Sequence, residues 1–396
     1  MATENNNKNL NVPNLRFPEF SGEWDRIKVS DLLEFYPTNS LSWSQLEYSE
    51  EGVLNLHYGL IHKGLPTQVD VFENSLPIIK EEFIPKKISL CLNGDVAFAD
   101  ASEDTNDVAK CIEFANCDGK KIVCGLHTIH GRDTQNKTVT GYKGYAFSAQ
   151  AFREQIRRLA QGTKIYSINS GNFSECYIGI PSKVEQSKIA NLLLAVDQRL
   201  AAQIKIIEDL KKLKSAIRAK VFKQLESSCE CWSEIGNMLQ YEQPSKYLVA
   251  STEYSDSYAT PVLTANKAFI LGYTDEEFGI YSKGECVIFD DFTMDVKFVN
   301  FPFKVKSSAI KILTANSGND LYFVYEYLQN LGLVLEEHKR HYISEIEPMI
   351  VACPTFEEQQ NISNLLRSFD SKIECANREL TLYNKQKQYL LSQMFI

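Results

Sequence analysis

Residues 180–197, IPSKVEQSKIANLLLAVD, and residues 353–370, CPTFEEQQNISNLLRSFD, are two versions of one segment, 173 positions apart. Adding 173 to a position in the first copy gives these pairs: Pro181/Pro354, Glu185/Glu358, Gln186/Gln359, Ile189/Ile362, Asn191/Asn364, Leu192/Leu365, Leu193/Leu366 and Asp197/Asp370. The register continues without a gap to Lys214/Lys387 and Phe222/Phe395. A gapless match of this length indicates an internal duplication.

Both copies have the pattern of a long amphipathic helix. Ser182 precedes Glu185 by three positions and Thr355 precedes Glu358 by three, which is the spacing of a capping box at a helix start. Apolar residues then recur every three or four positions, and neither proline nor glycine interrupts residues 182–222. A helix of about forty residues is roughly 60 Å long.

One apolar stripe on a long helix needs a partner, so the two copies are predicted to pack as an antiparallel coiled coil. The predicted seam is Leu193, Val196, Leu200, Ile207, Leu213 and Ile217 against Leu366, Phe369, Ile373, Leu380 and Leu390. The alternative is two ordinary amphipathic helices in a larger core.

Composition favours a globular protein of two or three domains. The chain has 396 residues, of which 44% are hydrophobic and 23% charged. No run of 18 apolar residues suggests a membrane span. The polar start reads as a disordered tail over residues 1–12, not as a signal peptide. The ten cysteines follow no disulfide pattern, so a cytoplasmic location is expected.

Charge is distributed unevenly along the chain. Residues 181–225 carry ten basic and four acidic side chains, whereas residues 226–352 carry nine and nineteen. The net charge of −9 argues against a simple nucleic-acid binder, although a local basic surface is compatible with one.

The segments before the two helices also resemble each other. NGDVAFAD (93–100) and KGECVIFDD (283–291) both have a glycine turn, an acid and an apolar run typical of a buried strand. Helices are expected at 148–161 and 319–331, and a strand before each long helix. The predicted domains are 1–180, 181–225 (first long helix), 226–352 and 353–396 (second long helix).

Motifs for catalysis are missing from the sequence. It has no phosphate-binding loop, HExxH, GxSxG or CxxC motif, and no methyltransferase Asn/Asp-Pro-Pro-Tyr motif. Cys111, Cys117 and Cys124 fit no zinc spacing. His127 and His130 offer a weak catalytic candidate, and Asp290 with Asp291 reads as a turn at a strand end more readily than as a metal site. A binding protein is therefore expected, with no catalytic residue, metal or cofactor of its own.

The chain resembles the specificity subunit of type I restriction–modification systems over nearly its whole length. Its start, PNLRFPEFSGEW (13–24), and the repeated P-[ST]-x-x-E-Q and I-x-N-L-L-x-x-x-D motifs are similar to that family. So are these segments between the repeats: LHYGLIHKG (56–64), LNGDVAFADASED (92–104), SINSGNFSECYIGIP (167–181), TPVLTANKAFILGY (260–273), VIFDDFT (287–293) and FKVKSSAIKIL (303–313).

The resemblance implies an α+β fold with two mixed target recognition domains, two long antiparallel coiled-coil helices and a pseudo-two-fold repeat. It implies that each recognition domain reads half of a bipartite target on double-stranded DNA, and that the helices set the spacing. Two modification subunits, which carry S-adenosylmethionine and methylate adenine, would dock on the helices. Restriction subunits, which translocate and cleave DNA, would join them.

Polar residues on turns beside strands are the candidate base readers, because Arg, Lys, Asn and Gln contact base edges in the major groove. They are His57, Tyr58, His62, Lys63, Ser102, Thr105, Arg132, Gln135, Asn136 and Lys137 in the first half, and Thr264, Asn266, Lys267, Thr293, Lys297 and Lys311 in the second. The alternative for each is a solvated loop residue. For the whole chain, the alternatives are a coiled-coil scaffold without a DNA role and an enzyme with an unrecognised site.

Overall fold

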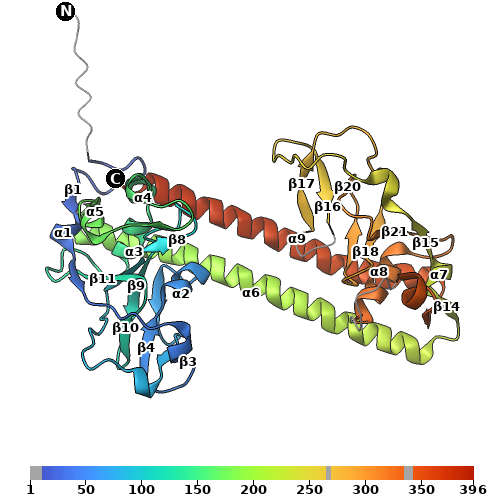
Figure 1. Ribbon diagram of the computed structural model, residues 1–396, viewed down its shortest axis with the longest axis horizontal. Coiled ribbons are helices and arrows are strands. Elements are labelled where there is room, and N and C mark those ends of the chain that lie inside the picture. Colours follow the sequence, from blue (N-terminus) through green and yellow to red (C-terminus); the bar gives the residue numbers. More distant parts are fainter. Residues whose placement is uncertain (1–10, 265–268, 334–341) are drawn as a thin grey trace, which may run out of the picture. The chain divides into compact units, whose positions relative to one another are not determined.

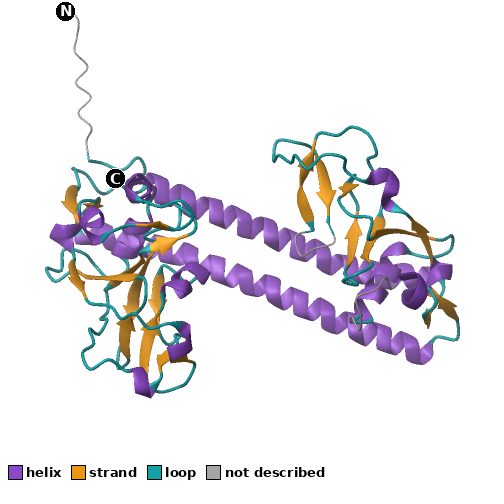
Figure 2. Cartoon of the chain, viewed as in Figure 1, coloured by secondary structure: helices purple, strands orange, loops and turns teal. Residues whose placement is uncertain are grey.

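The computed structural model describes residues 11–264, 269–333 and 342–396 (Figure 1). The chain divides into two units by its contacts. Unit 1 comprises residues 1–204 and 379–396, and unit 2 comprises residues 205–378. Each unit is mixed α and β (Figure 2) and includes one end of each long helix, α6 (Lys183–Ser228) and α9 (Phe356–Gln393). The predicted tail, 1–12, falls mostly outside the described residues.

Unit 1 has two main sheets. The five-stranded sheet has the order β2 (Glu34–Tyr36), β11 (Thr128–Arg132), β7 (Val96–Ala99), β9 (Cys111–Asn116), β5 (Gln68–Asp70). The four-stranded sheet has the order β10 (Lys121–Cys124), β4 (Val53–Leu56), β6 (Ile78–Ile79), β3 (Leu46–Glu47). The remaining elements are the strand pairs β1 (Asp25–Lys28) with β13 (Tyr177–Ile180) and β8 (Ala101–Ser102) with β12 (Tyr166–Ser167), and the helices α1 (Val29–Leu32), α2 (Tyr58–Lys63), α3 (Tyr142–Ser148), α4 (Gln150–Leu159) and α5 (Ser170–Ser174).

Unit 2 has a four-stranded and a three-stranded sheet. The four-stranded sheet has the order β15 (Leu239–Glu242), β21 (Ile310–Ala315), β18 (Cys286–Asp290), β19 (Val296–Val299). The three-stranded sheet has the order β17 (Ile270–Thr274), β16 (Thr260–Leu263), β20 (Lys304–Val305). The remaining elements are the pair β14 (Trp232–Glu234) with β22 (Ile350–Ala352), and the helices α7 (Ile235–Met238) and α8 (Leu321–Asn330).

The two units use one strand order. The run β2-β11-β7-β9 in unit 1 and the run β15-β21-β18-β19 in unit 2 are both antiparallel throughout. The central strands β7 and β18 are the apolar runs predicted from residues 93–100 and 283–291, and every residue in them is buried. The two-fold relation between the units stays a prediction.

The repeated glutamine ties each long helix to its own unit. The Gln186 side chain donates to the carbonyl of Pro181 (2.9 Å) and accepts from the backbone N–H of Val139 (2.9 Å). Gln359 donates to the carbonyl of Pro354 (3.0 Å) and accepts from the N–H of Asp320 (2.8 Å). Both amides are buried, and their hydrogen bonds offset the cost of removing them from water.

A lysine–aspartate pair joins the two helices in each unit, and the two pairs are related by the shift of 173. Lys387 of α9 contacts Asp197 of α6 at 2.6 Å in unit 1. In unit 2, Lys214 of α6 contacts Asp370 of α9 at 2.6 Å. A tyrosine hydroxyl donates to each aspartate, Tyr145 at 3.0 Å in unit 1 and Tyr322 in unit 2. In both units, therefore, the start of one helix lies beside the end of the other.

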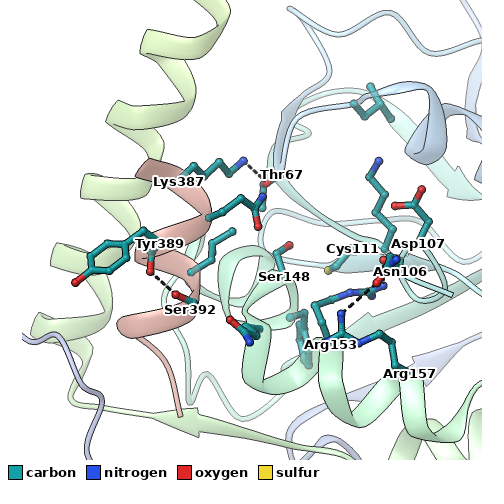
Figure 3. A pocket seen from close by; sticks show the side chains of 16 residues that line it. Thr67, Asn106, Asp107, Cys111, Ser148, Arg153, Arg157, Lys387, Tyr389 and Ser392 are labelled. Atoms are coloured by element: carbon teal, nitrogen blue, oxygen red, sulfur yellow. Dashed lines mark hydrogen bonds between the residues drawn. The ribbon is translucent and has the colours of Figure 1, made fainter. Parts of the chain in front are cut away.

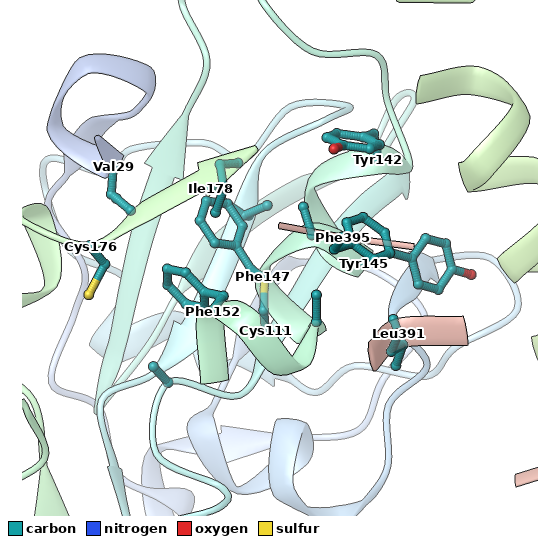
Figure 4. Close-up of a cluster of buried hydrophobic side chains, with 14 of the residues drawn as sticks. Val29, Cys111, Tyr142, Tyr145, Phe147, Phe152, Cys176, Ile178, Leu391 and Phe395 are labelled. Carbon is teal, nitrogen blue, oxygen red and sulfur yellow. The ribbon is translucent and has the colours of Figure 1, made fainter. Parts of the chain in front are cut away.

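The ends of the helices complete the cores. Leu391 and Phe395 of the α9 end enter the unit 1 core, where Phe395 lies 5.9 Å from the ring of Tyr142 (Figure 4). Phe222, the counterpart of Phe395 in the repeat, is fully buried in the unit 2 core, against the rings of α8.

Most predicted seam residues face the interior. The buried ones are Leu193, Val196, Leu200, Ile207, Leu366, Phe369 and Leu390, and the half-buried ones are Ile217, Ile373 and Leu380. Leu213 differs, because its side chain is 49% exposed. Its neighbour Lys214 follows Ile207 by a full heptad and takes the inward position, where it meets Glu326 as well as Asp370.

Two local predictions need correction. The expected helix at 148–161 is α4, which begins only at Gln150 because Ala149 has an extended backbone (ψ 149°) that separates it from α3. The capping box is complete only at Thr355 and Glu358. In the first copy the Ser182 hydroxyl caps the helix, but Glu185 turns to Arg16, whose guanidinium binds it at 2.7 and 2.8 Å. Within the described ranges, we find no helix with the length and apolarity needed to cross a membrane.

The packing predicts which leucines of the long helices stabilise the protein. Leu193→Ala and Leu366→Ala each remove a fully buried side chain, so each should lower the free energy of unfolding by about 2–5 kcal/mol. Leu213→Ala, at a half-exposed site on the same helix, should change it by no more than about 0.5 kcal/mol. Urea unfolding followed by circular dichroism measures all three. A loss at Leu213 equal to that at Leu193 would contradict the packing described.

Candidate nucleic-acid interface

An aromatic cluster of unit 1 surrounds the start of α2, and we call it the α2 cluster. Its members are Trp43, His57, Tyr58, His62, Lys63 and His127. The ring of His57 lies 4.4 Å from Trp43 and 4.7 Å from Tyr58. Tyr58 meets His62 at 5.8 Å and His127 at 5.2 Å, both edge to face. Four of the six are predicted base readers, and the structure brings these four together.

Local sequence fixes the cluster. The Nδ1 of His57 accepts from the N–H of Gly59 (3.1 Å) and so caps α2, and Gly64 ends the helix with φ 110°. His127 has a left-handed backbone (φ 52°), and its ring contacts Asp100 Oδ1 at 3.1 Å. The ring of His62 contacts the carbonyl of Ala101 (2.9 Å), so α2 is held against the β8 segment that includes the predicted reader Ser102.

Lys63 supplies a cation to the cluster. Burial lowers the pKa of His57, and His127 and Lys63 act in the same direction, so the His57 ring is neutral at pH 7. The Lys63 ammonium lies 5.4 Å from the centre of the Trp43 ring, which is 40% exposed. Exposed aromatic faces beside a cation suit contact with a base edge or a phosphate. Trp43 was missed from the sequence because it lies in a separate short 3-10 helix, Trp43–Gln45, and reaches α2 only through tertiary packing.

The second predicted loop of unit 1 has two exposed readers. Gln135 and Asn136 are exposed, and Asn136 has φ 54°. The Lys137 ammonium donates to the carbonyl of Asp31 at 3.0 Å. Arg132 binds Asp95 through Nε (2.8 Å) and Nη2 (2.7 Å) and stacks on Tyr36. Its guanidinium is therefore already occupied inside the protein.

Ser102 and Thr105 lie on the turn after β8. The Ser102 hydroxyl accepts from the N–H of Asp104 at 3.1 Å, and Thr105 is half-buried. These two therefore shape the turn beside His62.

Of the predicted readers of unit 2 that the structure describes, Thr293, Lys297 and Lys311 lie on or beside the four-stranded sheet and Thr264 lies beside the three-stranded sheet. Asn266 and Lys267 lie outside the described residues. Thr293 is exposed in the turn after β18, and its hydroxyl accepts from the N–H of Asp295 (3.4 Å). Lys297 pairs with Asp295 at the surface. Thr264 is only 8% exposed, at the end of β16.

The structure differs from the prediction at Lys311. Its side chain is buried on β21, where the ammonium contacts Asp291 at 3.2 Å and the Tyr241 hydroxyl at 3.2 Å. Asp290 accepts from the N–H groups of Phe292 (2.8 Å) and Thr293 (3.3 Å), which confirms the turn predicted at this strand end. Lys311 therefore balances a buried acid, in a position that a DNA base does not reach.

A polar cavity of about 620 Å³ lies between α4, the 106–111 segment and the last turns of α9 in unit 1 (Figure 3). Four basic side chains line it: Lys110, Arg153, Arg157 and Lys387. Arg153 donates to the Asn106 carbonyl and Arg157 donates to its Oδ1 (3.1 Å). These four residues share no pattern in the sequence, because three separate segments supply them.

His127 and His130 do not form one solvent-facing site. His127 is half exposed, whereas His130 is fully buried and its Nε2 lies 2.7 Å from Asp95 Oδ2. Burial opposes protonation of His130, but Asp95 and Cys91 raise its pKa to about 9. The hydrogen-bonded series Arg132–Asp95–His130 therefore links a surface loop to the interior of unit 1.

Comparison with known proteins places the chain beside type I specificity subunits. It is 42% identical to the EcoR124I/EcoR124II specificity subunit of Escherichia coli over 176 residues, which are 41% of this chain and 44% of that protein. It is 23% identical to a putative type I specificity subunit, MjaX, of Methanocaldococcus jannaschii over 97% of this chain and 96% of that one. No family model matches the chain.

Two solved structures share the fold over at least 93% of this chain. A type I S subunit from M. genitalium has a TM-score of 0.57 at 16% identity, covering 97% of this chain and 99% of that chain. A chain from a structure of type I restriction–modification complex assembly has a TM-score of 0.56 at 13% identity, covering 93% and 96%. The α+β fold with long helices and the resemblance to type I specificity subunits are thereby confirmed.

The burial of the candidate lysines separates structural from surface roles. Lys311→Met removes a buried cation from beside the Asp291 carboxylate, and the two side chains are only 5% and 2% exposed. It should therefore lower the free energy of unfolding by about 3–5 kcal/mol. Lys297→Met breaks an ion pair whose side chains are 41% and 40% exposed, so it should cost no more than about 1 kcal/mol. Chemical denaturation measures both, and equal costs would refute the buried role of Lys311.

Proposed function

We propose that this chain, a relative of type I specificity subunits, is the DNA-recognition subunit of a type I restriction–modification complex. In this proposal unit 1 and unit 2 each read one half of a bipartite target. The observation that carries the proposal is the repeated frame: the Gln186 and Gln359 contacts and the two Lys–Asp–Tyr contacts recur under one shift of 173. Two units that share these contacts but differ in their loops are suited to read two different DNA sequences.

The α2 cluster is the proposed reader of unit 1. Its aromatic faces and the exposed Lys63 offer stacking and charge, and the Gln135–Asn136 loop at the other end of β11 offers amide groups, the chemistry that reads base edges and holds phosphates. In unit 2 the proposed reader includes Thr293 and Lys297 on the β18–β19 turn, together with Asn266 and Lys267.

The long helices are the proposed docking surface for two modification subunits. Two copies of one partner need two similar surfaces, and the duplicated helices supply them. Exposed apolar side chains support this role: Ile206 (48%) and Leu213 (49%) on α6, and Leu382 (62%) and Tyr389 (59%) on α9. The partners would carry S-adenosylmethionine and methylate adenine, restriction subunits would join them, and this chain would contribute no catalytic residue.

Charge supports a shared DNA interface. Residues 226–352 carry ten more acidic than basic side chains, so the second reader repels phosphates unless partners neutralise them. We therefore propose that much of the phosphate contact comes from the modification subunits, and that the isolated chain binds DNA weakly.

The decisive experiment is co-expression of the chain with its modification subunits, followed by sequencing of methylated adenines. A bipartite motif that depends on this chain supports the proposal. Methylation that is independent of the chain, or a motif in one piece, overturns it and favours the coiled-coil scaffold.

Exchange of one recognition domain tests the assignment of half-sites. Replacing residues 1–180 with the matching segment of a relative should change one half of the methylated motif and leave the other intact, because each unit has its own core and loops. The reciprocal exchange of residues 226–352 is the matched control and should change the other half. A change in both halves after either exchange would defeat the two-reader model.

Paired deletions in the long helices test whether they set the spacing between half-sites. Removing one heptad from each helix, residues 205–211 and 372–378, shortens each by about 10 Å and keeps the apolar stripes nearly in phase. Because DNA advances 3.4 Å per base pair, the unread gap should shorten by up to about three base pairs, or activity should be lost. Deletion from α6 alone, which breaks the match between the helices, is the control. An active paired variant that keeps the original gap would show that something else spaces the readers.

A further inference from the structure

Two cysteines and a histidine from three segments of unit 1 meet in its interior. Cys124 ends β10, His130 lies in β11, and Cys91 precedes β7, with its N–H bonded to the carbonyl of Ile122 at 2.8 Å. Each is at most 2% exposed. One ligand atom from each residue lies within 4.8 Å of the other two. Among the three cysteines weighed in the sequence, only Cys124 takes part.

The two sulfurs have the separation that a shared metal ion requires. Their Sγ atoms lie 3.6 Å apart. With zinc–sulfur bonds of about 2.3 Å, this separation gives an S–Zn–S angle of about 103°, close to the tetrahedral value of about 109°. A disulfide needs a separation of about 2.05 Å, and a linear S–metal–S arrangement with the same bonds needs about 4.6 Å. The observed separation, which is also that of two thiols in contact, is too long for a disulfide and matches tetrahedral coordination.

His130 has the hydrogen bonding of a metal ligand. Its Nε2 lies 2.7 Å from Asp95 Oδ2, whereas its Nδ1 is buried without a hydrogen-bond partner among the described residues. Asp95 is held in turn by Arg132 and by the N–H of Leu92 at 2.9 Å. In metal sites the second ring nitrogen of a ligand histidine donates to a carboxylate, which orients the ring. Asp95 fills this role, and the free Nδ1 is the atom left for a metal.

Charge and ligand type agree with a thiophilic divalent cation. Two thiolates neutralise a 2+ ion, His130 binds the ion as a neutral imidazole after losing its Nδ1 proton, and Arg132 already balances Asp95. Thiolate and imidazole ligands suit Zn²⁺ and disfavour Mg²⁺ or Ca²⁺. Cys124 also lines a cavity of about 870 Å³ with Asn39, Lys86 and Lys87, so solvent can supply the fourth ligand.

We propose that Cys91, Cys124 and His130 form a structural zinc site. The ion links the four-stranded sheet, through Cys124 of β10, to the five-stranded sheet, through His130 of β11. Residues 125–127 connect β10 to β11 and include His127 of the α2 cluster. The site therefore holds both ends of a turn on which part of the candidate reader rests. This proposal is independent of the proposed function.

Metal content of the intact chain is the first test. The protein, purified under reducing conditions and incubated with Zn²⁺ before desalting, should retain about one zinc per chain by elemental mass spectrometry. Replacement of zinc by Co²⁺ should give a thiolate-to-cobalt charge-transfer band. A chain that retains no zinc, or one whose mass under non-reducing conditions shows a Cys91–Cys124 disulfide in place of a metal, overturns the proposal.

Variants identify the ligands. Cys91→Ser and Cys124→Ser should each abolish the band, whereas Cys117→Ser, a buried cysteine of the same unit that is outside the cluster, should keep it. Asp95→Asn preserves all three ligands but weakens the bond to His130 Nε2, so zinc affinity should fall about 10–100-fold. This variant keeps the test decisive if the cysteine variants fail to fold. Loss of the band in Cys117→Ser, or unchanged affinity in Asp95→Asn, would place the metal elsewhere.

Discussion

The fold depends on each long helix having an apolar stripe that only the other helix and the two cores can cover. In unit 1 the last residues of the chain, Met394 and Phe395, pack with Tyr142 and with the start of α6. In unit 2 Phe222 at the end of α6 packs beside Leu366 near the start of α9. Neither unit is therefore a continuous piece of sequence. The first unit is complete only when residue 395 is in place, which couples the folding of the two ends of the chain.

The two lysine–aspartate pairs fix the register in which the two long helices pack. Apolar stripes at three-and-four spacing tolerate several registers, whereas a partly buried cation without its acid is costly. Lys387 reaches Asp197 in unit 1, and Lys214 reaches Asp370 in unit 2. A shift of either helix by one turn separates both pairs and withdraws the aspartate of that helix from its tyrosine. Charge thus selects one register among those that hydrophobic packing permits.

The long helices and the central strands were predicted well from the sequence, because each depends on local sequence patterns that occur in both halves of the chain. The helix starts, the inward leucines and the buried strands at 93–100 and 283–291 need only periodicity and turn residues to be recognised. Leu213 was misplaced because a polar residue, Lys214, takes the inward position to meet acids from α8 and α9. Periodicity of apolar residues alone gives no sign of such a substitution.

The candidate site was harder to predict from the sequence, because the residues that bind its side chains are distant in the sequence. Arg132 and Lys311 belong to the residue types that contact base edges, yet each forms an ion pair with a buried acid, Arg132 with Asp95 and Lys311 with Asp291. Trp43 joins His57, and Cys91 joins Cys124, only through tertiary packing. A basic residue beside a strand is therefore ambiguous until its acids are located.

The frame and the variable surface are energetically separate. The buried amides of Gln186 and Gln359 are satisfied by the backbone of their own units, so these bonds do not depend on the loop side chains that face solvent. The side chains of Gln135, Asn136 and Thr293 are exposed, and the loop of Gln135 and Asn136 contacts Gln186 through its backbone, by the carbonyl of Lys137 at 3.1 Å. Substitution at such positions costs little stability, whereas repeat residues such as Gln186, Gln359, Leu193 and Leu366 are buried. A fold of this kind can change what its loops contact and still keep the contacts that hold its two long helices in register.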